Sequence, residues 1–306
     1  MLRFLAQRLL ALLFIALTIA YFLFLAMHLI DQARNVEPDA AAAWTTFIPL
    51  AAQDTLTFFS GVIGGDLEPV PTISGPRPVK DILWFAYANS LGLLWRALLL
   101  AAVVGVGLGV RAALTQRKIG GYALLTLAVV GVSAPSFLIA VLLQNGSLRF
   151  NDFLERRWIS MGGFGWEFQY LILPLLVLSA KPIAYIMRAT YIALRRVLQE
   201  DFIRTARSKG LTWNWMFWVH IARNVAVPVL TTIGVSLRFC LGVLPLVEFI
   251  FGWPGVGLRV LEAVQENNPV LVVAIALSLG LTIQLLSLVL DFSYRYIDPR
   301  LREEMA

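Results

Sequence analysis

The sequence is poor in cysteine, histidine and charge. Among 306 residues there are one cysteine, Cys240, and two histidines, His28 and His220. A single cysteine rules out a disulfide within the chain, and neither a CxxC pair nor a His-rich metal spacing occurs. Charged residues make up 14% of the chain, whereas a soluble domain carries roughly 25%. We therefore expect a membrane protein with no bound metal and no other cofactor.

Nucleotide-binding and catalytic motifs are also missing. The pattern G-x-x-x-x-G-K-[ST] does not occur, so this chain has no P-loop for ATP. No nucleophile–base pair is evident. The run Gly105-x-Gly107-x-Gly109 lies in an apolar stretch without a βαβ context, which favours a close-packing helix face over a nucleotide fingerprint. We expect no enzymatic activity, and any ATP hydrolysis must come from a separate subunit.

Long apolar runs are what the sequence has instead. Hydrophobic residues make up 59% of the chain. Several runs of about 20 apolar residues are each long enough to cross about 30 Å of hydrocarbon as a helix. They predict an all-α membrane protein with six transmembrane helices, and the first is too long for the apolar core of a signal peptide. The predicted spans are 9–30, 85–110, 119–144, 168–187, 226–251 and 270–293.

The basic residues indicate the orientation of the chain. With the N-terminus inside, the inner segments hold fifteen Lys and Arg residues and the outer segments hold seven. Because cytoplasmic loops are enriched in these residues, both termini are predicted to be cytoplasmic. The net charge of +6 is then explained by the inner loops, not by nucleic-acid binding.

The predicted spans divide the chain into three ranges. Residues 1–30 form the first transmembrane helix, and residues 31–84 form an external segment with scattered charges, glycines and prolines. Inside that segment, residues 40–59 have apolar positions at helical spacing and suit a helix along the outer interface. Residues 85–306 form a five-helix core that contains a cytoplasmic loop, 195–221. Residues 145–167 are predicted to be a second outer loop.

The cytoplasmic loop has the pattern of a short amphipathic helix. From Arg195 to Lys209, apolar and charged residues alternate at helical spacing, and Gly210 ends the pattern. A second run, Trp213–Ile221, leads back to the membrane. On periodicity alone, an interfacial linker helix and a docking element for a partner both remain open.

The residues of this loop resemble those of a known family. Residues 201–210 are DFIRTARSKG, followed by His220-x-x-Arg223-Asn224-x-x-x-Pro228. This run is similar to the conserved cytoplasmic loop of permease subunits of binding-protein-dependent ABC importers, in the B-type version of the oligopeptide/dipeptide/nickel group. Residues 1–10, 248–257 and 291–302 resemble other parts of these permeases. The family's usual Pro-Gly-Asp-Pro after the first span is missing.

The resemblance implies a type I ABC importer permease with a cytoplasmic coupling helix, in a bacterial inner membrane. It would pair with a second permease subunit, two cytoplasmic ATPases and an external solute-binding protein, and peptides are the leading substrates. Nickel complexes, glutathione and other small solutes remain alternatives, as does a secondary transporter that works without an ATPase. The residues expected to dock the ATPase are Asp201, Phe202, Ile203, Arg204, Ala206, Arg207, Lys209 and Gly210.

Charges inside the apolar stretches are candidates for the translocation path. Such charges are costly in lipid and usually face a cavity or a partner helix. The predicted path residues are Arg238, Glu248 and Arg96, although Arg96 also suits the outer interface. After the fifth span, a turn rich in Gly and Pro is predicted to shape the outer mouth, with a plain inter-helix turn as the alternative. Its residues are Gly252, Pro254, Gly255 and Gly257.

Overall fold

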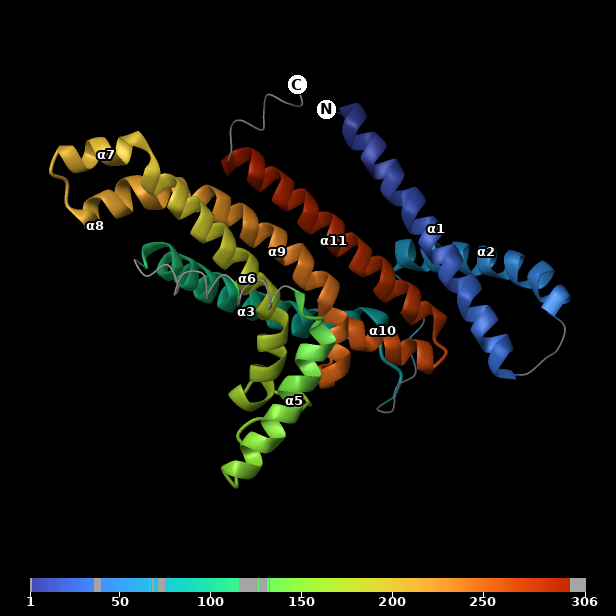
Figure 1. Cartoon of the computed structure of the whole chain (residues 1–306). Helices are drawn as coiled ribbons and strands as arrows, with labels where there is room; N and C mark the ends of the chain where they lie inside the picture. Colours follow the sequence, from blue (N-terminus) through green and yellow to red (C-terminus); the bar gives the residue numbers. More distant parts are fainter. Residues whose placement is uncertain are drawn as a thin grey trace. The chain divides into compact units, whose positions relative to one another are not determined.

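The protein is mainly helical in the residues described by the computed structural model, which are 2–35, 40–65, 67, 69–70, 75–115, 126, 131 and 133–297. Within these residues, Val70 and Arg77 form an isolated antiparallel bridge. Figure 1 shows the helices. Their bounds are α1 Leu2–Asn35, α2 Ala40–Gly64, α3 Val79–Leu114, α5 Ser136–Phe153, α6 Phe168–Gln199, α7 Asp201–Ser208, α8 Trp213–Met216, π-helix η1 Phe217–Ile221, α9 Ala222–Phe251, α10 Val256–Gln265 and α11 Pro269–Ile297.

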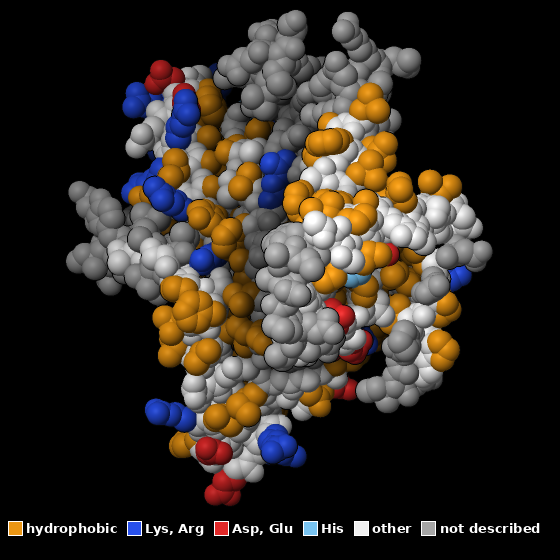
Figure 2. Space-filling model, turned by 90° about the vertical axis from the view of Figure 1, so that its right-hand side faces the viewer, with side chains coloured by type: hydrophobic (Ala, Val, Ile, Leu, Met, Phe, Trp, Pro, Cys, Tyr) orange, Lys and Arg blue, Asp and Glu red, His pale blue; other side chains and the backbone are white. Residues whose placement is uncertain are grey.

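Five stretches among the described residues are long and apolar enough to cross a membrane, and they confirm five of the predicted spans. They are Leu10–Arg34, Val79–Leu114, Phe168–Gln199, Trp213–Phe251 and Pro269–Leu290. The face drawn in Figure 2 shows many exposed hydrophobic side chains with Lys and Arg scattered among them. A surface of this kind suits contact with lipid.

The third predicted span, 119–144, is described only in part, at residues 126, 131 and 133–144. Its described end differs from the prediction, because α5 begins at Ser136 after an extended Pro135 and continues to Phe153. The predicted loop start at residue 145 is therefore wrong. The side chains of Asn145 and Ser147 donate hydrogen bonds to backbone carbonyls of the preceding turn. Polar residues satisfied in this way do not end a helix.

The chain divides into two compact units. One contains residues 1–88 and 254–282, and the other contains residues 89–253 and 283–306. These units group residues by packing, whereas the predicted ranges group them by topology. The first unit therefore combines α1, α2 and the start of α3 with α10 and the first half of α11.

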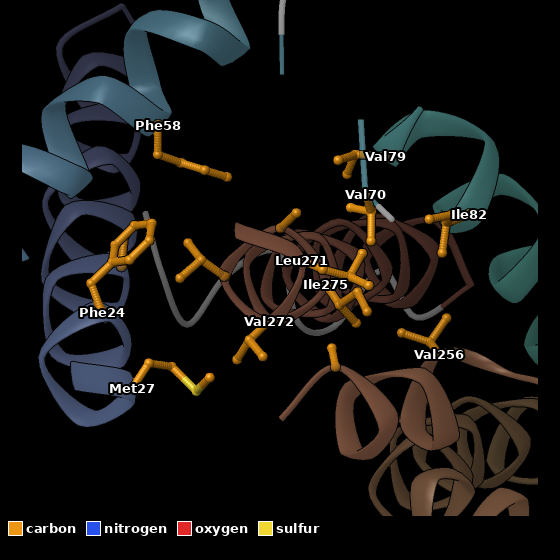
Figure 3. Packing of buried hydrophobic residues seen from close by; sticks show 14 of the residues in the cluster. Phe24, Met27, Phe58, Val70, Val79, Ile82, Val256, Leu271, Val272 and Ile275 are labelled. Carbon is orange, nitrogen blue, oxygen red and sulfur yellow. The ribbon is translucent and has the colours of Figure 1, made fainter. Parts of the chain in front are cut away.

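The core of the first unit is formed by side chains from five helices. Figure 3 shows Phe24 and Met27 of α1 with Phe58 of α2, and Val79 and Ile82 of α3 with Val256 of α10 and Leu271, Val272 and Ile275 of α11. Polar contacts hold the end of α1 to the end of α10 and to the turn that follows it. The Arg34 guanidinium donates to the carbonyls of Val264 and Gln265, and Asn267 Nδ2 donates to Asp31 Oδ1 at 2.7 Å.

In the second unit, α3 packs against α6 through two of its glycines. A Cβ atom on Gly109 would lie 2.6 Å from Thr190 Cβ, and one on Gly105 would lie 2.9 Å from Ile186 Cβ. Real Cβ atoms do not approach so closely, so the backbones meet only because these side chains are absent. Gly107 has nothing within 4 Å of such an atom. The predicted close-packing face is therefore carried by Gly105 and Gly109 without Gly107.

Candidate functional site

The candidate site begins where α6 ends and the chain turns into α7. Glu200 is extended and separates the two helices, and Asp201 in the first turn of α7 is placed favourably for the helix dipole. At the other end, Gly210 has a φ of +73°. Gly210 N donates to Arg207 O and Leu211 N donates to Ala206 O, which is the hydrogen-bond pattern of a Schellman motif. The prediction that Gly210 ends the helix is confirmed.

One face of α7 is buried inside the chain itself. Ile203 is 1% exposed and Ala206 is also buried, in a cluster that includes Leu194 of α6 and Ile221 of η1. The docking role of Ile203 and Ala206 stays a prediction, and within this chain neither side chain is exposed. Their apolar surface is removed from water by the chain's own helices, so these two side chains anchor α7 in place.

The opposite face of α7 is exposed. Asp201 and Arg204 form an ion pair at 3.2 Å on this face, and both side chains are open to solvent. Phe202 is 41% exposed although it is a large apolar residue. Arg207 and Lys209 are exposed as well. Of the predicted docking residues, these five and Gly210 remain available to a partner.

Two aromatic residues beyond α7 extend this exposed face. The Phe202 ring lies 6.5 Å from the His220 ring, and the Trp215 ring lies 5.2 Å from His220 in an edge-to-face arrangement. We call Phe202, Trp215 and His220 the aromatic patch. Trp215 and His220 were not among the residues predicted to dock a partner, because no periodicity connects α7 with α8 and η1. The His220-x-x-Arg223 motif was the only indication of this relationship in the sequence.

The return to the membrane runs through a π-helix. Phe217–Ile221 is a π-helical turn, and it continues without a break into α9. One extra residue per turn changes which side chains point inward. Ile221 is fully buried here, while Trp218 and Val219 are exposed. The predicted second run, Trp213–Ile221, is thus confirmed as a helical segment leading to the membrane.

The two predicted path arginines are both exposed within this chain. The Arg238 side chain lies on α9, and its Nη2 atom is 3.5 Å from the carbonyl oxygen of Ser287. The Arg96 guanidinium lies 4.2 Å from the centre of the Trp166 ring, and its Nη1 atom donates to Gly92 O. A tryptophan ring attracts a cation in this geometry, so Arg96 is held in a defined position.

Glu248 is in a different environment. It is 0% exposed, and its carboxylate accepts a hydrogen bond from the Ser90 hydroxyl of α3. Within this chain the side chain is enclosed and connects α3 to the end of α9. The role of Glu248 in the translocation path stays a prediction.

The turn after α9 is built around Trp253. Gly252 has a φ of +62°, which allows Trp253 N to donate to Glu248 O at 2.8 Å. The Trp253 side chain is fully buried, and its Nε1 atom donates to Asn89 O. The rings of Phe164 and Trp166 lie about 5 Å from it, edge to face. Pro254 and Gly255 lead into α10, and Gly257 is a buried residue of its first turn.

Comparison with known proteins identifies the family. The profile of the binding-protein-dependent transport system inner membrane component family matches residues 105–303. The chain belongs to this family. The glutathione transport system permease proteins GsiC of Salmonella typhimurium and Escherichia coli K12 are each 31% identical to this permease over 99% of both chains.

Solved structures show the same fold at lower identity. An amino acid ABC transporter crystallised with histidines matches with a TM-score of 0.56 and 15% identity, covering 71% of this chain and 94% of its own. The inward-facing MetNI methionine ABC transporter matches with a TM-score of 0.57 and 14% identity, covering 72% of this chain and 98% of its own. This permease is therefore a multi-pass inner-membrane subunit of an ABC importer, and it works in a complex with other subunits.

Proposed function

We propose that this permease forms, with a second permease subunit, the membrane path of an importer for peptide-sized solutes. ATP would be hydrolysed by two separate cytoplasmic ATPases, because this chain has no P-loop. An external solute-binding protein would deliver the solute. The relatives that cover the whole chain are named for transport of glutathione, which is a small peptide. This similarity supports a peptide-like substrate.

The proposed orientation places both termini and α7 in the cytoplasm. The distribution of Lys and Arg supports it. The test treats intact cells with a membrane-impermeant thiol reagent. We expect a cysteine introduced at residue 160 to be labelled and one introduced at residue 208 to be protected from the reagent. Labelling of residue 208 from outside would contradict the orientation.

The observation that carries the proposal is the two-sided anchoring of α7. The buried side chains of Ile203 and Ala206 anchor one face of the helix, and the Schellman motif at Gly210 stabilises its C-terminal end. A helix anchored in this way would transmit movement of a partner to α6, η1 and α9, whose buried residues share a cluster with Ile203 and Ala206. The exposed Phe202 with neighbouring charges suits a groove in a soluble partner, as in other helix-in-groove contacts. We assign this groove to the ATPase.

The path is proposed to include Arg238 and Arg96. An arginine exposed midway along a membrane helix costs several kcal/mol if it faces lipid alone. Facing an aqueous path or the second permease removes this cost. Both residues are exposed in the single chain and thus accessible to a solute or to a partner. Their positive charge suits a solute that carries a carboxylate.

The docking proposal is tested by Phe202→Ala and Arg204→Glu in the purified complex with its partner subunits. We expect a loss of ATPase retention, or of solute-stimulated hydrolysis, while membrane insertion is unchanged. Phe168→Ala is the matched control, because Phe168 is an exposed phenylalanine at the opposite end of α6. Retention, hydrolysis and uptake equal to wild type in both variants would refute the docking role.

A further inference from the structure

The helix α2 has three distinct faces. The first face packs on α1 and consists of Ala51, Thr55 and Phe58, all buried. Phe58 meets Phe24 with ring centres 6.1 Å apart, and Asp54 Oδ2 lies 2.8 Å from His28 Nε2. Asp54 is the one charged residue in Ala40–Gly64. The helix therefore carries no charged side chain other than this paired one.

The second face is apolar and exposed. It consists of Ile48, Ala52, Leu56 and Ile63, which fall within about 80° of one another around a helix of 3.6 residues per turn. Leu56 is 69% exposed and Ile63 is 87% exposed. No described part of the first unit covers these side chains, which together form a continuous apolar stripe.

The third face is polar and uncharged. Thr46, Gln53, Thr57 and Ser60 are all exposed and are centred about 100° from the apolar stripe. Several of the hydroxyls donate back to the helix, as Thr57 does to Gln53 O and Ser60 does to Thr57 O. Satisfying a hydroxyl within its own helix lowers the cost of placing it away from bulk water.

The contacts of α2 with α1 lie inside the membrane span of α1. That span is Leu10–Arg34. Phe24 and His28, which contact Phe58 and Asp54 of α2, both belong to it. The helix α2 therefore packs beside a part of α1 that is long and apolar enough to cross the membrane.

The helix α1 also carries exposed apolar side chains, as the apolar stripe of α2 does. The side chains of Ile15, Ile19 and Phe22 on α1 are exposed in the same unit. We propose that α2 is embedded in the outer half of the bilayer, with the Ile48–Leu56–Ile63 stripe against acyl chains and the polar face turned away from them. The occupant of this stripe is then lipid and not the solute-binding protein or the second permease.

The test uses spin labels on the whole transporter complex in vesicles of phosphatidylethanolamine and phosphatidylglycerol. Single cysteines replace Leu56 and Ile63 on the apolar stripe, and Thr57 and Ser60 on the polar face serve as matched controls. All four side chains are exposed, so the packing on α1 is retained. Cys240 is the only native cysteine and is replaced by alanine.

The expected result is a several-fold preference for collision with oxygen over a water-soluble nickel chelate at residues 56 and 63. At residues 57 and 60 this preference should be much weaker or reversed. Equal accessibility to the nickel chelate at 56 and 63 would place the stripe in water and overturn the proposal. Shielding of both positions from both reagents would overturn it in favour of a protein partner. Neither result depends on which solute is transported.

Discussion

Ser90 Oγ donates a hydrogen bond to Glu248 Oε1, and the preceding carbonyl of Asn89 accepts one from the Trp253 indole. Two adjacent residues of α3 thus hold the last turn of α9 and the second residue after its end. Glu248 and Trp253 are both fully buried. A buried polar group that loses its partner costs more than a normal hydrogen bond contributes, so this pair of contacts fixes the geometry of the turn.

Ser90→Ala should lower the stability of the complex by about 1–3 kcal/mol, because the Glu248 carboxylate loses a donor in a place that water does not reach. The loss is measured as a lower midpoint of thermal unfolding in detergent. Ser60→Ala is the control, since Ser60 is exposed. Equal midpoints for the two variants would show that the contact with Glu248 contributes no net stability.

Gly109→Ala should disrupt the packing of α3 on α6, since its new methyl group would approach Thr190 Cβ and Met187 O to less than 3 Å. An overpacked site of this kind costs about 1–3 kcal/mol. Gly107→Ala is the matched control, because it meets nothing within 4 Å. It should be neutral or slightly stabilising, since alanine has the higher helix propensity. The prediction fails if the thermal stabilities of the two variants match.

Gly210→Ala should weaken the coupling between ATP hydrolysis and uptake. The position has open space around it, so the difficulty is the φ of +73° alone. A residue with a Cβ atom in this region costs about 1–2 kcal/mol, and asparagine is tolerated better. Gly210→Asn should therefore retain more coupling than Gly210→Ala, as measured by solute uptake per ATP hydrolysed. The opposite order would rule out backbone strain as the cause.

Arg238→Leu should impair solute-stimulated transport while the complex still assembles. Arg238→Lys keeps the positive charge and should retain part of the activity. Val235→Leu on the same exposed side of α9 is the control for added bulk. Normal uptake by Arg238→Leu would reduce Arg238 to a residue of the helix surface, and loss of assembly would assign it to the contact with the second permease.

The sequence by itself determined the helical membrane class, five of the spans and the family. These features follow from local properties: the length of an apolar run, the position of Gly210 after an amphipathic pattern, and the order of residues in DFIRTARSKG. Each can be evaluated along the chain without knowledge of what packs on what. The end of α5 is the exception among local features, because Asn145 and Ser147 satisfy their polar groups within the helix.

Only the tertiary structure decided which way side chains face. Ile203 and Phe202 are adjacent apolar residues on α7, yet one is buried by the chain's own helices and the other is exposed. Glu248 and Arg238 are both charges within α9, yet one is enclosed beside Ser90 and the other lies on the surface. The physical reason is that burial depends on helices distant in sequence, so hydrophobicity and charge identify the residues that matter without assigning them to the core or to a partner.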